Sequence, residues 1–315
     1  WGLPLGDKDL WRRAGVRTTM GSRLFEHHVP EQSDEIVLAL DAAGAVSLGK
    51  TNAPEFGLAG YTESLVAPPA RTPWDPARGA GGSSGGAATA VAAGLLPVAP
   101  GSDGGGSIRI PAAATGLVGL KPSRGRVPAG SGFLSLAGLV AVGPLARTVA
   151  DAALLLDALD GPSPWATAPP RWDGGAYLNA AVRGEGRFQV GVTTTSPWDA
   201  HYDIRVSAEA SAALDLARRE LDALGHGVEE HALEPDDSYG PAFRTIWQAS
   251  AVGIPAEGER LALVEPLTRW LIDRGRALGA QGLADALRAL AVYERSVIPQ
   301  FAAYDVVLTP TLALT

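Results

Sequence analysis

The sequence contains no cysteine. This absence excludes disulfide bonds, thiolate metal ligands and cysteine nucleophiles. It fits a reducing compartment, and we expect a cytoplasmic protein. Histidine is also scarce, and none of the five histidines stands at the spacing of a zinc-binding HExxH motif. We therefore expect no bound metal and no cofactor.

Long apolar runs and an excess of basic residues are missing as well. No run approaches the roughly 18–20 apolar residues that a membrane-spanning helix requires, and the first residues do not resemble a signal peptide. Lys and Arg number 26 against 34 Asp and Glu, which gives a formal net charge of −8. Nucleic-acid-binding surfaces are normally basic. We therefore expect neither a membrane nor a nucleic acid as partner.

With 315 residues and a hydrophobic fraction of 46%, the chain has enough apolar material for a sizeable core. Apolar spacing and capping residues predict helices at 33–44, 87–96, 149–159, 207–224 and through most of 241–303. Buried or alternating patterns predict strands at 45–48, 95–99, 188–193 and 304–309. Such alternation of strands and helices predicts an α/β fold with a largely parallel or mixed sheet.

Three segments carry more specific local signals. The helix at 87–96 is almost entirely small and apolar, which predicts burial on all sides. Residues 67–82 are rich in Pro, Arg and Gly and predict an irregular loop. The Pro-rich stretch at 162–173 predicts a surface loop or a domain boundary.

Two clusters of glycine and serine lie in the first third of the chain, at 81–86 and 104–107. Each borders strongly apolar sequence, which argues against flexible linkers. Neither contains the GxxxxGK[ST] or the complete GxGxxG pattern of a phosphate-binding site. Residues 81–85 match the GxSxG nucleophile elbow, but that elbow must follow an apolar strand, and residues 73–80 do not form one. The elbow is therefore disfavoured.

Six blocks of the sequence match the pattern of one family. Three of them are highly specific: Gly-Gly-Ser-Ser-Gly-Gly at 81–86, Gly-Ser-Asp-Gly-Gly-Gly-Ser-Ile-Arg-Ile-Pro-Ala at 101–112, and Gly-Leu-Val-Gly-Leu-Lys-Pro at 116–122. The other three lie at 2–9, 49–56 and 304–310. Together these blocks closely resemble the amidase signature family.

The resemblance implies an α/β amidase signature fold, in which a mixed central β-sheet has helices on both faces. It implies a single domain over residues 1–315. Members of the family usually have a helical segment before the lysine-bearing strand and a further stretch after the Thr-Pro-Thr block. The chain resembles a member that lacks both.

The resemblance also implies a catalytic set: Ser107 as nucleophile, Ser83 on a cis peptide bond, and Lys8. These residue types make chemical sense, because a serine hydroxyl is a weak nucleophile until a base takes its proton. A buried lysine can be that base, since burial disfavours the ammonium form and lowers its pKa. Lys50 lies in a more conspicuous block, but the resemblance places the base at Lys8. Ser84 is interpreted as a helix cap or a hydrogen-bonding support.

Backbone N–H groups before the nucleophile are candidate donors to an oxyanion. Gly104, Gly105 and Gly106 lack a Cβ and allow a substrate to approach closely. The family more often has a threonine or a larger residue at position 104. Asp103 and Arg109 are expected to pair and hold this loop.

The resemblance implies hydrolysis of a carboxylic amide C–N bond through a covalent acyl-enzyme, with a small linear or cyclic amide as substrate. The chain is similar to bacterial amidases, including aminohexanoate-oligomer hydrolases. One alternative is the glutamine-hydrolysing A subunit of a glutamyl-tRNA amidotransferase, which usually has glutamine where Ile110 stands. Another is a catalytically inactive binding module. Phe243, Trp247 and Trp270 are candidates for an acyl pocket or for core packing, and a homodimer is compatible with the sequence.

Overall fold

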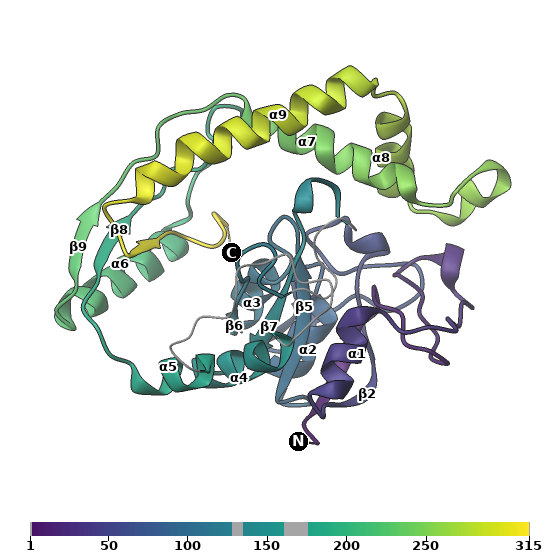
Figure 1. Cartoon of the computed structure of the whole chain (residues 1–315), viewed down its shortest axis with the longest axis horizontal. Helices are drawn as coiled ribbons and strands as arrows, with labels where there is room; N and C mark the ends of the chain where they lie inside the picture. The colour runs from purple at the N-terminus through teal and green to yellow at the C-terminus, as the bar shows by residue number, and fades with distance from the viewer. Residues whose placement is uncertain (1, 128–134, 161–175, 315) are drawn as a thin grey trace. The chain divides into compact units, whose positions relative to one another are not determined.

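The computed structural model describes three stretches of the chain, 2–127, 135–160 and 176–314 (Figure 1). The chain forms two compact units, Trp1–Gly184 with Pro255–Trp270, and Glu185–Ile254 with Leu271–Thr315. The Pro-rich stretch at 162–173 lies outside the described residues. The expectation of one domain over the whole chain stays a prediction.

The first unit is built on a three-stranded antiparallel sheet with the strand order β5 (Val98–Asp103), β7 (Ala141–Ala146) and β6 (Val118–Gly119). Successive side chains of a strand point to opposite faces of the sheet. Val98 and Val142 accordingly join one hydrophobic cluster, whereas Ala99 and Leu145 join another. The core therefore has two layers, one on each face.

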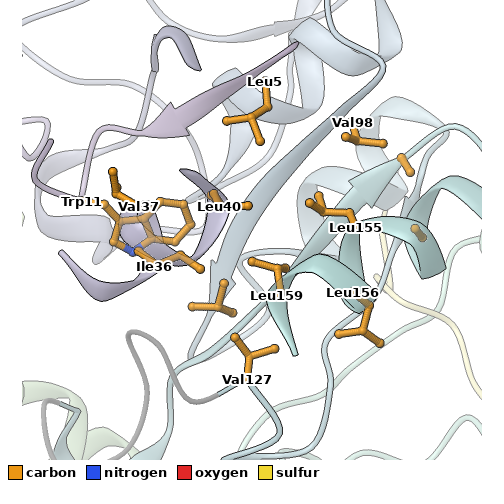
Figure 2. Close-up of a cluster of buried hydrophobic side chains, with 13 residues drawn as sticks. Leu5, Trp11, Ile36, Val37, Leu40, Val98, Val127, Leu155, Leu156 and Leu159 are labelled. Atoms are coloured by element: carbon orange, nitrogen blue, oxygen red, sulfur yellow. The ribbon is translucent and has the colours of Figure 1, made fainter. Parts of the chain in front are cut away.

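Helices supply the partners on both faces of this sheet. On one face, α1 (Glu35–Ala42) and α4 (Val149–Leu159) bring Ile, Val and Leu side chains into the cluster that contains Leu5 (Figure 2). On the other face, α2 (Gly85–Ala92) and α3 (Arg109–Thr115) contribute mainly alanine. Each fully buried Val, Ile or Leu contributes about 1.5–3 kcal/mol. The predicted α/β fold with helices on both faces is confirmed.

A two-stranded parallel sheet carries the lysine block. β1 (Pro4–Lys8) pairs with β2 (Val46–Thr51), with Lys8 opposite Thr51. α1 lies between the two strands in the sequence, as a parallel pair requires a crossover. β1 also lies beside β5, so the start of the chain reaches the glycine cluster that follows β5.

Two predictions in this region are wrong in detail. The strand predicted at 95–99 is displaced to β5, which includes glycine and serine. These residues are weak strand formers, but the full ladder with β7, a strand that the sequence pattern did not predict, gives them partners. The helix predicted at 87–96 ends at Ala92, and its residues Thr89 and Ala90 are only half-buried, so the helix is not buried on all sides.

The segment 67–82 was expected to be an irregular loop, yet part of it is a hairpin. β3 (Arg71–Thr72) pairs antiparallel with β4 (Asp75–Gly79). Pro73 and Trp74 form the turn between them. The composition correctly indicated a turn, but it concealed the short strands on either side.

The second unit has its own parallel sheet, with the strand order β10 (Val306–Leu308), β8 (Gln189–Val192) and β9 (Gly227–Glu230). On its helix α7 (Tyr239–Ser250), the rings of Tyr239 and Phe243 stack at 5.8 Å and those of Phe243 and Trp247 at 5.6 Å. Phe243 and Trp247 thus pack against each other, whereas Trp270 is 47% exposed. A role of these rings in an acyl pocket stays a prediction.

The remaining helices are α5 (Tyr177–Arg183), α6 (Ala208–Ala223), α8 (Pro266–Arg276) and α9 (Ala280–Val297). Short 3-10 helices occur at Arg23–Phe25, Glu55–Gly57, Leu136–Gly138, Ala251–Gly253, Gly258–Leu263 and Ile298–Phe301. The prediction that most of 241–303 is helical is confirmed. Across the described residues, no helix is long and apolar enough to cross a membrane.

Candidate active site

Lys8 is the last residue of β1, and its side chain is fully buried. Its Nζ atom lies 2.9 Å from Ser83 Oγ, 2.8 Å from Ser84 Oγ and 3.0 Å from Ser102 Oγ. An ammonium group has three N–H donors, and buried donors need acceptors. The three hydroxyls meet this need, and none of them carries a charge.

Burial lowers the pKa of Lys8 to about 7, against the opposing effect of the negative charge of Asp103. Near neutral pH a substantial fraction of Lys8 is therefore an uncharged amine. A neutral Nζ has two N–H groups and one lone pair, so among three hydroxyls it donates to two and accepts from the third. The site thus contains a buried amine that is able to take a proton from a serine hydroxyl.

Ser83 and Ser84 lie between the β3–β4 hairpin and α2. The peptide bond between Gly82 and Ser83 is cis, as the resemblance implies. Ser84 occupies the N-cap position of α2, but its side chain makes no capping hydrogen bond and contacts Lys8 instead. Of the two interpretations of Ser84, hydrogen-bonding support agrees with the structure and side-chain capping does not.

Ser107 lies in the turn between β5 and α3 and is 7% exposed. Its carbonyl oxygen accepts a hydrogen bond of 3.2 Å from Ser84 N, which joins the two serine loops directly. In the described part of the chain, no hydrogen bond joins the Oγ atoms of Ser83 and Ser107. The structure therefore brings Lys8, Ser83 and Ser107 to one place, with Ser83 in contact with the amine.

Asp103 braces the turn that carries Ser107. Its buried carboxylate accepts hydrogen bonds from Gly106 N (2.7 Å), Ile108 N (3.2 Å) and Arg109 Nε (2.9 Å). Burial raises the pKa of Asp103, but the Arg109 guanidinium and the backbone donors outweigh it and hold the pKa below its usual value. The expected pairing of Asp103 with Arg109 is confirmed.

The loop 104–106 gives the three candidate oxyanion donors different surroundings, and their role stays a prediction. The Gly106 N–H donates a hydrogen bond to Asp103 Oδ1. Gly104 is half-buried and Gly105 is exposed. At Gly106 φ is +121°, and a Cβ there would lie 2.7 Å from Ile110 Cδ1, which explains why this position requires glycine.

The segment at 57–61 forms a wall beside Ser83. A Cβ on Gly57 would lie 3.4 Å from Ser83 Oγ and 2.7 Å from Leu10 Cδ1. A Cβ on Gly82 would lie 2.3 Å from Tyr61 O, so the two backbones touch. Only glycine at these positions allows such an approach.

The family model described as Amidase matches residues 1–315. The chain belongs to the amidase signature family. The putative amidase AmiB2 of Mycobacterium tuberculosis strain H37Rv is 40% identical over 318 residues, which cover 99% of this chain and 65% of that protein. The A subunit of the glutamyl-tRNA(Gln) amidotransferase from Anaeromyxobacter dehalogenans is 41% identical over 288 residues, which cover 90% of this chain and 55% of that protein.

Among solved structures, 6-aminohexanoate cyclic dimer hydrolase in complex with substrate matches with a TM-score of 0.86 and 32% identity. The match covers 96% of this chain and 65% of the hydrolase. The family and the fold that the sequence blocks implied are confirmed. The chain spans less than two thirds of the length of each of these three proteins.

Ser102 is the contact of Lys8 that sequence reasoning missed. A signal was available, because a buried ammonium needs three acceptors and Ser83 and Ser84 supply only two. Apart from Ser107, Ser102 is the one residue with a side-chain hydroxyl in the block 101–107. The described residues contain no group of three His, Asp or Glu side chains that could hold a metal ion.

Proposed function

We propose that the protein containing this chain is an amidase that cleaves carboxylic amide C–N bonds through an acyl-enzyme on Ser107. The observation that carries the proposal is the fully buried amine of Lys8, 2.9 Å from Ser83 Oγ and with a pKa of about 7. A base whose pKa lies near the working pH is effective in general base catalysis. The membership of the amidase signature family supports the same reaction.

In the proposed reaction Ser107 Oγ attacks the carbonyl carbon of the amide. Its proton passes to Ser83 Oγ, and the Ser83 proton passes to Lys8 Nζ. When the C–N bond breaks, the proton returns along the same route to the leaving nitrogen. Water then attacks the Ser107 ester and passes a proton through Ser83 to Lys8. When the ester bond breaks, that proton returns through Ser83 to Ser107 Oγ, and the carboxylic acid is released with the serine and the neutral amine regenerated.

We propose Gly104 and Gly105, together with Ser107, as backbone donors to the tetrahedral oxyanion. The exposure of Gly105 and the half-burial of Gly104 support this choice. Gly106 contributes indirectly, because its bond to Asp103 holds the turn that presents its neighbours. One donor to an oxyanion typically accounts for about 10²–10³ in rate.

The experiment that tests the proposal is covalent labelling of the full-length protein with a fluorophosphonate. We expect labelling of the wild type, no labelling of Ser107→Ala, and a loss of at least about 10⁴-fold in amide hydrolysis by that variant. Ser123→Ala, which changes an exposed serine, is the matched control and is expected to label normally. A folded wild-type protein that does not label would contradict the proposal and favour an inactive binding module.

The substrate class is proposed as small linear or cyclic amides. The similarity to 6-aminohexanoate cyclic dimer hydrolase supports amides of this kind.

A second candidate is glutamine hydrolysis, favoured by the 41% identity with the A subunit of an amidotransferase. The apolar Ile110, whose side chain packs against Gly106, argues for the first candidate, since it offers no polar group to an amide side chain. Ammonia release from glutamine, set against hydrolysis of a p-nitroanilide panel, distinguishes the two.

A further inference from the structure

Glu55 is a buried carboxylate close to the wall beside Ser83, and the reaction proposed above does not use it. It is 3% exposed. Its Oε1 accepts a hydrogen bond of 2.5 Å from Ser22 Oγ, and its Oε2 accepts one of 2.8 Å from Glu265 N. Glu55 begins the segment 55–65, which contains this wall, and it ties the segment to two parts of the first unit that are far away in the sequence.

Glu265 holds the other end of the same segment. Its Oε1 accepts a hydrogen bond of 3.2 Å from Leu65 N. The backbone of Glu265 thus binds one end of the segment 55–65, and its side chain binds the other. Burial and the neighbouring Glu55 charge raise the pKa of Glu265, as expected where two carboxylates approach each other.

The backbone is strained at Phe56, in the segment 55–65, and at Met20, to which Phe56 is hydrogen-bonded. Phe56 has φ of +51° and Met20 has φ of +53°, a region that side chains other than glycine rarely adopt. Phe56 N donates a hydrogen bond of 2.8 Å to Met20 O, so the two strained residues hold each other. Such conformations persist only where the surroundings enforce them, and they concentrate at functional sites.

The held segment touches the Ser83 loop at more than one point. Besides Gly57 beside Ser83 Oγ, Thr62 Oγ1 donates to Gly81 O (2.9 Å) and accepts from Gly85 N (3.1 Å). A displacement of the segment would therefore be transmitted to Ser83.

We propose that Glu55 and Glu265 form a clamp that holds residues 55–65 against the Ser83 loop, and that Glu265 is a positioning residue for the hydroxyl of Ser83. The proposal rests on the function proposed above for Ser83 and Ser107. Neither glutamate contacts the reacting atoms in this assignment; both act through the backbone of the segment.

The test compares Glu265→Ala with Glu265→Gln in the full-length protein. Alanine removes the acceptor for Leu65 N, whereas the amide oxygen of glutamine keeps it. Glu259→Ala, an exposed carboxylate on the same stretch of chain, is the matched control. The measurements are the fluorophosphonate labelling rate of Ser107, kcat and KM per active site, and hydrogen exchange of the amides of 57–65.

For Glu265→Ala we expect labelling and kcat to fall about 10- to 100-fold, because a small misplacement of a catalytic group has effects of this size. KM should change little, and exchange of the 57–65 amides should be faster. Glu265→Gln and Glu259→Ala should behave like the wild type. A structural role alone would lower the melting temperature and leave the rate per labelled site unchanged, and that result would overturn the proposal.

Failure of the proposed function is a different outcome. If the folded wild type does not label at all, the proposed role of Ser107 as nucleophile is wrong. The clamp proposal is then tested by hydrogen exchange alone. Faster exchange of the 57–65 amides in Glu265→Ala, but not in Glu265→Gln, supports it. Unchanged exchange in both variants overturns it.

Discussion

Each face of the β1–β2 sheet carries one buried or partly buried lysine, and the two lysines have different neighbours. On one face, Nζ of Lys8 lies among the hydroxyls of three serines. On the other face, Lys50 donates a hydrogen bond to Trp11 O and lies near the carboxylates of Asp9 and Asp7. Residues 7 and 8 are neighbours on one strand, and strand alternation sends their side chains to these different surroundings.

Burial lowers the pKa of both lysines, but the two amines differ in the groups that lie next to them. At Lys50 the negative charges of Asp9 and Asp7 oppose the effect of burial. At Lys8 burial prevails over Asp103, and the pKa falls to about 7. The comparison teaches that burial is opposed by several carboxylates at Lys50 and by Asp103 alone at Lys8, whose other polar neighbours are uncharged hydroxyls.

The largest expected effect comes from removing each amine in turn. Lys8→Met should lower kcat/KM by about 10³-fold, since it removes the proposed proton acceptor. Lys50→Met should lower it less than about tenfold, because its amine lies on the other face. Steady-state kinetics with a p-nitroanilide measures both variants. Equal losses would break the comparison and return Lys50 to the candidates for the base.

The next largest effect concerns the stability of the protein and involves Asp7, on the same face of the β1–β2 sheet as Lys50. Asp7 is fully buried and binds Arg13 Nε at 2.6 Å, so Asp7→Ala removes one of the two carboxylate partners of a half-buried guanidinium, which keeps Asp41. We expect a loss of about 2 kcal/mol in the free energy of unfolding, measured by urea denaturation, which is less than for a fully buried charge left without a partner. The control Ser47→Ala, which removes only a neutral donor to Asp7, should cost about 1 kcal/mol. If the two variants lose the same stability, the ion pair has no special role.

The third prediction is a pH dependence that separates the two lysines. Protonated Lys8 has no lone pair, so kcat/KM should fall as the pH drops below about 7, by about tenfold per pH unit. The sign follows from the lowered pKa: the active, neutral form is present above it and lost below it. Lys50→Met should keep the same acid limb. A wild-type profile that is flat from pH 8 to pH 5 would exclude Lys8 as the titrating base.

The smallest effect comes from changing one hydroxyl beside Lys8. Ser102→Ala removes an acceptor for an Nζ–H group, which disfavours the ammonium form, so the acid limb should move to lower pH. The loss in kcat/KM should be about fivefold, in line with one neutral hydrogen bond. Ser102→Thr keeps the hydroxyl and should restore the wild-type profile. A shift of the limb to higher pH in Ser102→Ala would contradict this account.

The sequence predicted the elements with strong apolar patterns better than those with weak ones. The helix expected at 149–159 occupies those residues in α4, because its buried positions recur at helical spacing. β7 and the β3–β4 hairpin were missed, since their strands are short or rich in glycine and proline and are stabilised by partners rather than by propensity. Strand pairing is a tertiary property, and no local pattern records it.

The same division applies to the site. The sequence blocks by themselves indicated the family, and that resemblance singled out Lys8 in the block 2–9 together with Ser83 and Ser107 in the glycine and serine blocks, because the order of residue types along the chain is enough to recognise a motif. Only the tertiary structure revealed the contact of Ser102 with Lys8, the occupation of the Gly106 N–H by Asp103, and the link from Glu55 to Glu265. The contacts of Ser102 and Glu265 join residues that are far apart in the chain. The pKa of Lys8 is also a tertiary property, because desolvation depends on which groups the folded chain packs around the amine.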